Sequence, residues 1–214
     1  MSKVNKIFVG VLLFMAFVSV CFLTTAYAYP VTPYLKISLF SSMYDSQGSF
    51  LSNMTVGGHS WIQIKNESYT DSVEIAGYVL NPRDKMTIGL WGTMSDVHDG
   101  VWVNVEGKKR TIYNSAYKSN RSITSVCHHD DVYHINNFIN DNNYYNLFSH
   151  NCTHFAIGLW NELFSNLNFY SNYPAQLFNR LGELNSYEYN SFTGFNKKTG
   201  YYDNSIMHYY IINK

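Results

Sequence analysis

The stretch around Cys152 combines a thiol with the start of a helical pattern. HNCTHFAIGLWN covers His150 to Asn161 and places one cysteine directly after Asn151. Asn151 is a favourable N-cap, so the sequence predicts a helix that begins at Cys152 and extends to about residue 166. Cys152 lies on the apolar stripe of this helix, which continues through Phe155, Ala156, Leu159, Trp160, Leu163 and Phe164.

A cysteine in the first turn of a helix is placed for nucleophilic chemistry. Unpaired N–H groups and the positive end of the helix dipole stabilise a thiolate and lower the cysteine pKa. The same N–H groups are able to hold an oxyanion, and Asn151 is a candidate to contribute to that site besides capping the helix. The other interpretation of Cys152 is a buried structural residue, which is the usual role of an isolated cysteine.

A thiol nucleophile needs a base, and His59 is the histidine whose surroundings fit that role best. It follows Gly57 and Gly58 and opens the β-rich run HSWIQIKN. Glycines let another backbone or a ligand approach closely. A histidine at the mouth of a strand is also held rigidly, as a general base must be. The alternative is an ordinary polar residue at a strand end.

Strand patterns followed by helical patterns predict one α+β domain, in which an antiparallel β-sheet packs against helices. The expected strands are 34–43, 59–66, 73–80, 86–92, 100–106, 110–117 and 122–127, and the expected helices are 130–141, 152–166 and 173–184. Residues 186–214 are rich in Tyr and Asn and weakly patterned, so we expect a polar tail there.

Residues 1–28 have the pattern of a secretory signal peptide. MSKVNK supplies two lysines before an uncharged apolar run, and AYA supplies a small-x-small cleavage pattern that ends at Ala28. We therefore expect cleavage after Ala28, a domain over residues 29–185, and a secreted mature protein that is not embedded in a membrane. The alternative is an uncleaved membrane anchor formed by residues 7–27.

Composition and cysteine content limit the partners and cofactors. Fifteen basic and fifteen acidic residues cancel, so the chain lacks the excess of positive charge that is typical of nucleic-acid-binding proteins. We also expect a monomer. Cys127 and Cys152 remain after cleavage, and a disulfide between them is open because spacing does not fix the Cα separation. A zinc site built on Cys127, His128 and His129 matches no structural zinc spacing, so we expect no metal and no cofactor.

GHSWIQIKN and HNCTHFAIGLWN, in this order, resemble the circularly permuted papain-like hydrolases of the NlpC superfamily. NC-x-x-F-A at a helix start is similar to their cysteine signature, and NC-x-H-F is similar to the lecithin:retinol acyltransferase-like branch. The resemblance covers residues 57 to about 166. It implies a permuted papain-like arrangement with the histidine strand before the cysteine helix, with Cys152 as nucleophile and His59 as its base.

Sites of this kind usually contain a third polar group that orients the imidazole, presented from the next strand. Glu74 and Tyr78 are the polar residues of VEIAGYVL and share one face of it, and strand register favours Tyr78 for this role. The resemblance implies a cysteine peptidase or amidase, with peptide bonds of cell-wall peptidoglycan as the substrate of exported bacterial members. The alternatives are an acyl-lipid hydrolase or acyltransferase and a secreted binding module with a degenerate site.

Overall fold

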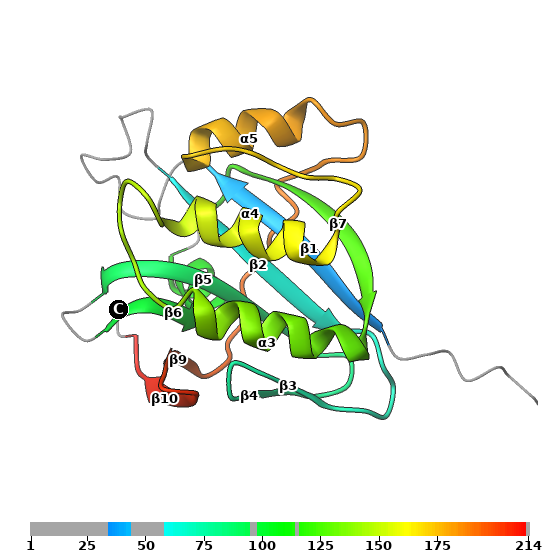
Figure 1. Cartoon of the computed structure of the whole chain (residues 1–214), viewed down its shortest axis with the longest axis vertical. Coiled ribbons are helices and arrows are strands. Elements are labelled where there is room, and N and C mark those ends of the chain that lie inside the picture. The colour runs from blue at the N-terminus through cyan, green and yellow to red at the C-terminus, as the bar shows by residue number, and fades with distance from the viewer. Residues whose placement is uncertain (1–33, 44–57, 95–97, 114–115, 213–214) are drawn as a thin grey trace, which may run out of the picture. The chain divides into compact units, whose positions relative to one another are not determined.

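An antiparallel sheet is the framework of the protein, which is described by a computed structural model over residues 34–43, 58–94, 98–113 and 116–212. In these ranges the sheet has eight strands in the order β10-β9-β6-β5-β2-β1-β7-β8 (Figure 1). Their bounds are β1 Tyr34–Ser42, β2 His59–Asn66, β5 Lys85–Met94, β6 His98–Val103, β7 Asn120–His128, β8 Glu188–Tyr189, β9 Thr199–Asp203 and β10 Ile206–Tyr210.

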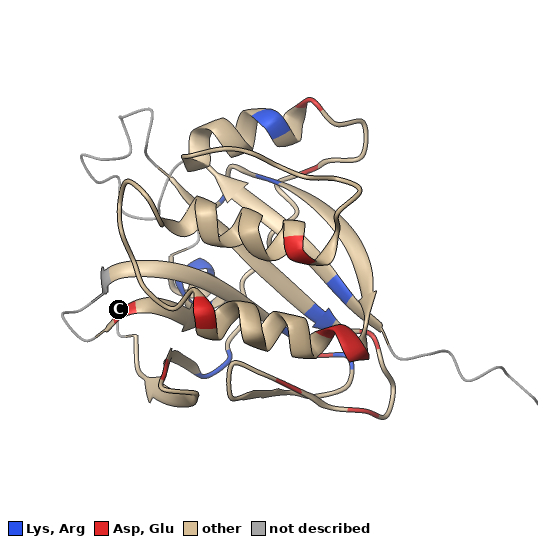
Figure 2. Cartoon of the chain, viewed as in Figure 1, with Lys and Arg blue, Asp and Glu red and all other residues tan. Residues whose placement is uncertain are grey.

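Four helices of the described ranges pack against this sheet, which confirms the predicted α+β class. They are α2 Val105–Ile112, α3 Val132–Asp141, α4 Cys152–Leu163 and α5 Pro174–Gly182, with a short 3-10 helix, His129–Asp131, before α3. Figure 1 shows α3, α4 and α5 over the same face of the sheet. Helix α4 contacts β2 and β5, whereas α5 contacts β1 and β7. Charge is sparse on α4, where Glu162 is the single acidic residue (Figure 2).

The core is divided into two clusters by the alternation of side chains along the central strands. Leu39 and Ile62 are partners in the β1–β2 register and belong to a cluster that the helices complete. Phe40 and Trp61 are the next partners and therefore point to the opposite face, where they pack with Tyr117. Both faces of β1 and β2 are thus covered, which holds the first residue of β2 firmly in place.

The segment 73–80, expected to form one strand, does not pair with the main sheet. It is a hairpin of β3 Val73–Ile75 and β4 Tyr78–Leu80, which form their own two-stranded sheet. Ala76 and Gly77 have φ angles of 51° and 67°, the left-handed conformations that a tight two-residue turn requires. This turn folds the segment back on itself, so β5 and not β4 pairs with β2.

The expected strands at 100–106 and 110–117 also differ from the structure. Strand β6 ends at Val103, Asn104 adopts a left-handed φ of 63°, and α2 begins at Val105. Asn104 is buried and held in place from both ends of its amide, which accepts from Thr87 N–H at 3.1 Å and donates to Lys198 C=O at 2.9 Å. These tertiary bonds end the strand and place Glu106 in the first turn of a helix.

Residues 186–214, expected to be a polar tail, supply three strands to the sheet. Strand β8 pairs with β7, and β9 pairs with β6. Backbone hydrogen bonds to existing strands order this segment, so its weak side-chain pattern gave little indication of it. The expected signal peptide lies outside the described residues. Among the residues that are described, no helix is both long and apolar enough to cross a membrane.

Candidate active site

Helix α4 begins at Cys152, as the sequence predicts, and the Asn151 side chain fixes this start. Its Oδ1 accepts from the N–H groups of Thr153 at 2.9 Å and His154 at 3.3 Å. Its Nδ2 donates to the carbonyls of Leu147 and Asn172, so both ends of the amide are occupied within the protein. Asn151 is therefore a cap rather than an oxyanion contact. The backbone N–H of Cys152 is not engaged by this cap.

His59 is the first residue of β2 and is almost fully buried, at 4% exposed. Gly58 before it has a φ of +104°, and a Cβ there would lie 2.1 Å from the Ser42 carbonyl oxygen. Only glycine fits this close approach of β1, which is the role the sequence suggested for the glycine pair. Gly57 lies outside the described residues.

Glu106 holds the imidazole of His59. Its Oε1 lies 2.8 Å from His59 Nε2 and accepts a second bond from Trp91 Nε1 at 3.0 Å. The Glu106 side chain is fully buried, and its Oε2 has no hydrogen-bond partner within the described part of the chain. Gly89 leaves room for the contact between Glu106 and His59, because a Cβ at that position would lie 2.2 Å from Glu106 Oε1 and 3.0 Å from His59 Nε2.

His59 and Cys152 interact through their side chains, and each favours the charged form of the other. Burial alone opposes protonation of His59. The Cys152 thiolate, by its charge and its hydrogen bond, together with Glu106, nevertheless raises the His59 pKa to about 9. Because Nε2 is bonded to Glu106, Nδ1 is the nitrogen left for the sulfur.

The pKa of Cys152 is lowered despite burial, which by itself would raise it. The charge and hydrogen bond of His59 provide the largest opposing effect, and the Ser60 backbone N–H and the Thr153 hydroxyl add to it. A lowered thiol pKa beside a raised imidazole pKa favours a thiolate–imidazolium pair at neutral pH. Cys152 is itself buried, with 8% of its surface exposed.

Glu106 is ionised because its interaction with His59 outweighs the effect of its burial. Burial raises its pKa, but the hydrogen bond and the positive charge of His59 outweigh burial and lower the pKa below its usual value. Its position in the first turn of α2 adds the favourable end of a helix dipole. Three groups of alternating charge, Cys152, His59 and Glu106, therefore stabilise one another in a buried row.

Aromatic rings limit how the His59 imidazole can turn. The Trp91 ring lies 4.1 Å from it with an interplanar angle of 37°. Trp61 and Tyr117 flank it at 5.8 Å and 5.9 Å between ring centroids. Aromatic faces also favour a cation, so this cage supports the protonated imidazole as well as its orientation.

Tyr145 interacts electrostatically with Cys152. Its pKa is raised to about 12, first by burial, then by the charge of a Cys152 thiolate and of Asp99. Its ring fills the space beside Gly92, where a Cβ would lie 2.6 Å from the ring. The phenol is therefore protonated at neutral pH and keeps its O–H as a hydrogen-bond donor. Sequence reasoning missed it, since nothing local distinguishes it among 19 tyrosines.

Neither Glu74 nor Tyr78, the residues expected to orient the imidazole, is brought to His59. Glu74 is exposed on β3, where its carbonyl accepts from Asn136 Nδ2. Tyr78 lies on β4, and its pKa is raised by burial against the opposing charge of Lys197. The expectation was wrong because it assumed that 73–80 pairs with β2. Glu106 takes this position instead. It lies two residues after Asn104, which is not the three-residue spacing of a capping box, so the sequence carried no local signal for it.

Cys127 and Cys152 are both free thiols in the structure, so the disulfide left open by the sequence is not formed. Cys127 is buried in β7, and burial together with Asp131 raises its pKa to about 12. Within the described ranges, no group of three or more His, Cys, Asp or Glu residues is arranged to hold a metal ion. The two thiols thus differ sharply in chemical character.

Comparison of the chain with protein-family models, with curated proteins and with solved structures finds no match. The resemblance to permuted papain-like hydrolases accordingly stays a hypothesis carried by two short motifs. The residues of the site and their mutual geometry are the basis for the function proposed next.

Proposed function

We propose that this protein is a secreted thiol hydrolase that cleaves amide bonds through Cys152 and His59. The observation that carries the proposal is the buried row Cys152–His59–Glu106, in which the thiol pKa is lowered and the imidazole pKa is raised to about 9. A nucleophile, a base and a third group that orients the base are the parts that thiol acyl transfer needs. The chain order of histidine strand before cysteine helix supports a permuted papain-like arrangement.

In the first half of the reaction, the Cys152 thiolate attacks the carbonyl carbon of the substrate and forms a C–S bond. The negative charge that develops on the carbonyl oxygen is held by the Cys152 backbone N–H and the Tyr145 hydroxyl. Protonated His59 then gives its proton to the leaving amine nitrogen, the C–N bond breaks, and a thioester remains on Cys152.

In the second half, neutral His59 takes a proton from water as the oxygen attacks the thioester carbon. The C–S bond breaks, a carboxylic acid is released, and the thiolate–imidazolium pair is restored. Glu106 remains ionised throughout and keeps the His59 ring aligned between sulfur and leaving group. We propose cell-wall peptidoglycan peptides as the first substrate class, on the grounds of the expected export.

A second candidate is the hydrolysis or transfer of lipid acyl groups. It is favoured by the exposed side chains of Leu147 and Phe148, which are 46% and 78% exposed directly before the Asn151 cap. Asn146 Oδ1 accepts from the backbone N–H groups of Phe148 and Ser149, so this apolar loop is held in a defined turn beside the nucleophile helix. Apolar groups at that place suit an acyl chain as well as an apolar peptide side chain.

The test is turnover of three substrate panels, namely muropeptides, short peptides and lipid esters or amides, by the mature wild-type protein. Cys152→Ala and His59→Ala are expected to lose activity to a similar degree, because the members of a nucleophile–base unit act together. Amide cleavage dependent on Cys152 supports the hydrolase, and turnover confined to lipids supports the second candidate.

Cys152→Ser serves as the matched control for folding, since it changes one atom at the helix start. If it keeps the wild-type melting temperature and loses turnover, chemistry and not stability was lost. If wild type turns over no panel, or if the double variant of Cys152 and His59 retains full activity, the hydrolase proposal is wrong and a binding module is the better description.

A further inference from the structure

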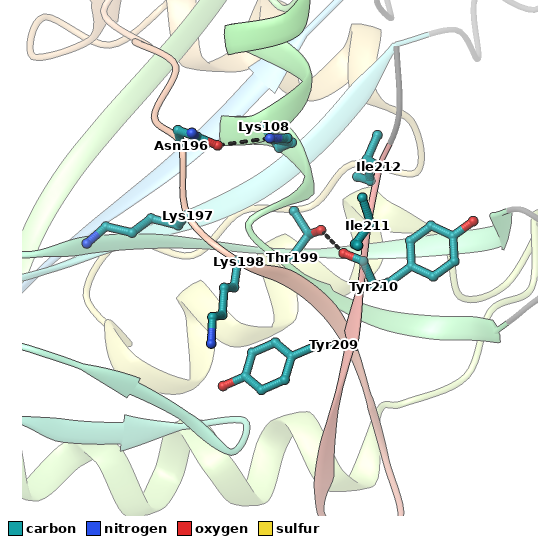
Figure 3. Close-up of a pocket in the computed structure, with 9 residues that line it drawn as sticks. All are labelled: Lys108, Asn196, Lys197, Lys198, Thr199, Tyr209, Tyr210, Ile211 and Ile212. Atoms are coloured by element: carbon teal, nitrogen blue, oxygen red, sulfur yellow. Dashed lines mark hydrogen bonds between the residues drawn. The ribbon is translucent and has the colours of Figure 1, made fainter.

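A cavity of about 610 Å³ lies between α2 and the segment 209–212 (Figure 3). Its volume is in the range of small-molecule binding sites, which is roughly 300–1,000 Å³. It is lined by Lys108, Asn196, Lys197, Lys198, Thr199, Tyr209, Tyr210, Ile211 and Ile212. None of these residues belongs to the row Cys152–His59–Glu106, so the cavity is separate from the candidate active site.

The lining is cationic. It contains three lysines and no acidic residue, although the charges of the chain as a whole balance. Lys197 is neutralised by an ion pair with Asp84 at 2.5 Å, and Figure 3 shows its side chain directed away from the other two lysines. Lys108 and Lys198 form no ion pair with any described residue. Two positive charges of the lining are therefore left without a carboxylate.

Neutral contacts hold these two ammonium groups in place. Lys108 Nζ donates to Asn196 Oδ1 at 2.9 Å, and Lys198 Nζ lies 4.9 Å from the centre of the Tyr209 ring. The Thr199 hydroxyl donates to the Tyr210 carbonyl and ties β9 to β10 at the same place (Figure 3). Both lysines line the cavity, so an anion bound there would add charge-assisted hydrogen bonds to them.

The rest of the cavity lining includes large apolar and aromatic side chains. Tyr209 and Ile211 are 60% and 78% exposed, and Tyr210 and Ile212 complete the wall that they form. Large apolar side chains that gather at a cavity lose unfavourable contact with water when a ligand covers them. The ligand that suits both kinds of side chain is a small organic anion, with one acidic group for the lysines and an aliphatic or aromatic body for this wall.

We infer that the cavity between α2 and β9–β10 binds a small organic anion of this kind, independently of the thiol chemistry proposed above. The probe for the test is 1-anilinonaphthalene-8-sulfonate, which has one sulfonate on an aromatic body. Its uncharged counterpart, N-phenyl-1-naphthylamine, lacks only the sulfonate. Fluorescence titration of the folded mature protein with each compound measures the two affinities.

The double variant Lys108→Gln/Lys198→Gln is expected to bind the sulfonate about tenfold more weakly, because it loses two charge-assisted contacts. Lys118→Gln, an exposed lysine outside the cavity, is the matched control and should bind as wild type does. Affinity of the wild type for the sulfonate should also fall with rising salt, since the lysines are near solvent.

Three results would overturn the inference: equal binding of the sulfonate by the double variant and wild type, equal binding of charged and uncharged probes by wild type, or loss of binding after alkylation of Cys152. The last result would place the probe in the candidate active site. Tyr209→Ser provides a second variant that keeps both lysines, and it should weaken both probes while the melting temperature stays unchanged.

Discussion

At the scale of single residues, the site depends on one carboxylate that the rest of the protein encloses. Glu106 is fully buried and accepts hydrogen bonds from both His59 and Trp91 on one oxygen. A buried charge is stable only while its partners are present. The charge and hydrogen bond of Glu106 therefore add to those of the Cys152 thiolate in raising the His59 pKa, and His59 in turn lowers the Cys152 pKa.

The pH dependence of wild type follows from these shifts. Thiolate and imidazolium coexist above the lowered pKa of Cys152 and below the raised pKa of His59, about 9. We expect kcat/KM to fall as pH rises through about 9, because neutral His59 has no proton for the leaving group. Glu106→Gln removes a negative charge that favours imidazolium, so this alkaline limb should move to lower pH. The activity at neutral pH should fall roughly hundredfold to ten-thousandfold.

A pH profile of kcat/KM for wild type and Glu106→Gln checks this prediction. Trp91→Phe is a second comparison, because it keeps an aromatic ring beside His59 and removes the indole N–H that donates to Glu106. It should shift the limb in the same direction by a smaller amount. An alkaline limb that stays in place in Glu106→Gln would show that Glu106 does not control His59.

Gly89→Ala should disable the site through one methyl group. The new Cβ would lie 2.2 Å from Glu106 Oε1, so the buried carboxylate must move away from His59. We expect iodoacetamide to alkylate Cys152 at neutral pH at least about tenfold more slowly. A rise of one unit in the thiol pKa lowers the fraction of reactive thiolate about tenfold. Stopped alkylation followed by mass spectrometry measures the rate.

Gly182→Ala is the control for that experiment. Its Cβ would be equally close to another side chain, at 2.1 Å, but that side chain is Arg121, which has no contact with Glu106, His59 or Cys152 among the hydrogen bonds and ring contacts of the described residues. Cys152 in this variant should react at the wild-type rate. Similar slowing in both glycine variants would point to a general loss of stability in place of a local effect at Glu106.

At the scale of elements, the start of α4 is set by its cap. Asn151→Ala removes an acceptor for two N–H groups and a donor to two carbonyls, so the free energy of unfolding should fall by about 1–3 kcal/mol. Asn151→Asp keeps the acceptor and is expected to restore part of that loss. It also adds a negative charge beside Cys152, which should raise the cysteine pKa and slow alkylation.

Urea denaturation gives the free energies, and alkylation rates against pH give the cysteine pKa in the same variants. The cap prediction fails if Asn151→Ala unfolds at the wild-type urea concentration. The electrostatic prediction fails if Cys152 in Asn151→Asp titrates at or below the wild-type pKa.

At the scale of the whole molecule, the two thiols are expected to react very differently. The Cys127 pKa is raised to about 12 by burial and Asp131, whereas the Cys152 pKa is lowered. Iodoacetamide near neutral pH should therefore modify Cys152 in the folded protein and leave Cys127 intact. Peptide mapping locates the adduct, and the denatured protein, in which both thiols react, is the control. Preferential modification of folded Cys127 would contradict the assignment of the nucleophile.

Export is the second property that belongs to the whole chain. We expect the secreted protein to begin at Tyr29, because the small-x-small pattern ends at Ala28. Mass spectrometry of the N-terminal peptide in the medium checks this. A product that keeps residues 7–27 and sediments with membranes would instead support the anchor interpretation.

The sequence by itself determined those parts of the protein that depend on local pattern. Alternation and flanking turns gave β2 its bounds, His59–Asn66, and the apolar stripe after a capping residue gave α4 its first residue, Cys152. Both short motifs are local, because a strand end and a helix start are encoded by a few neighbouring residues. The positions of Cys152 at a helix start and of His59 at a strand start were therefore predictable one at a time.

Only the tertiary structure decided which residue completes the site. Glu106 reaches His59 because Asn104 is locked by bonds to Thr87 and Lys198, which are far away in the sequence. The same kind of long-range pairing drew the C-terminal residues into the sheet through β9 and β6. Periodicity within a segment carries no information about which distant strand will pair with it, and one wrong pairing, that of 73–80 with β2, pointed to the wrong third residue.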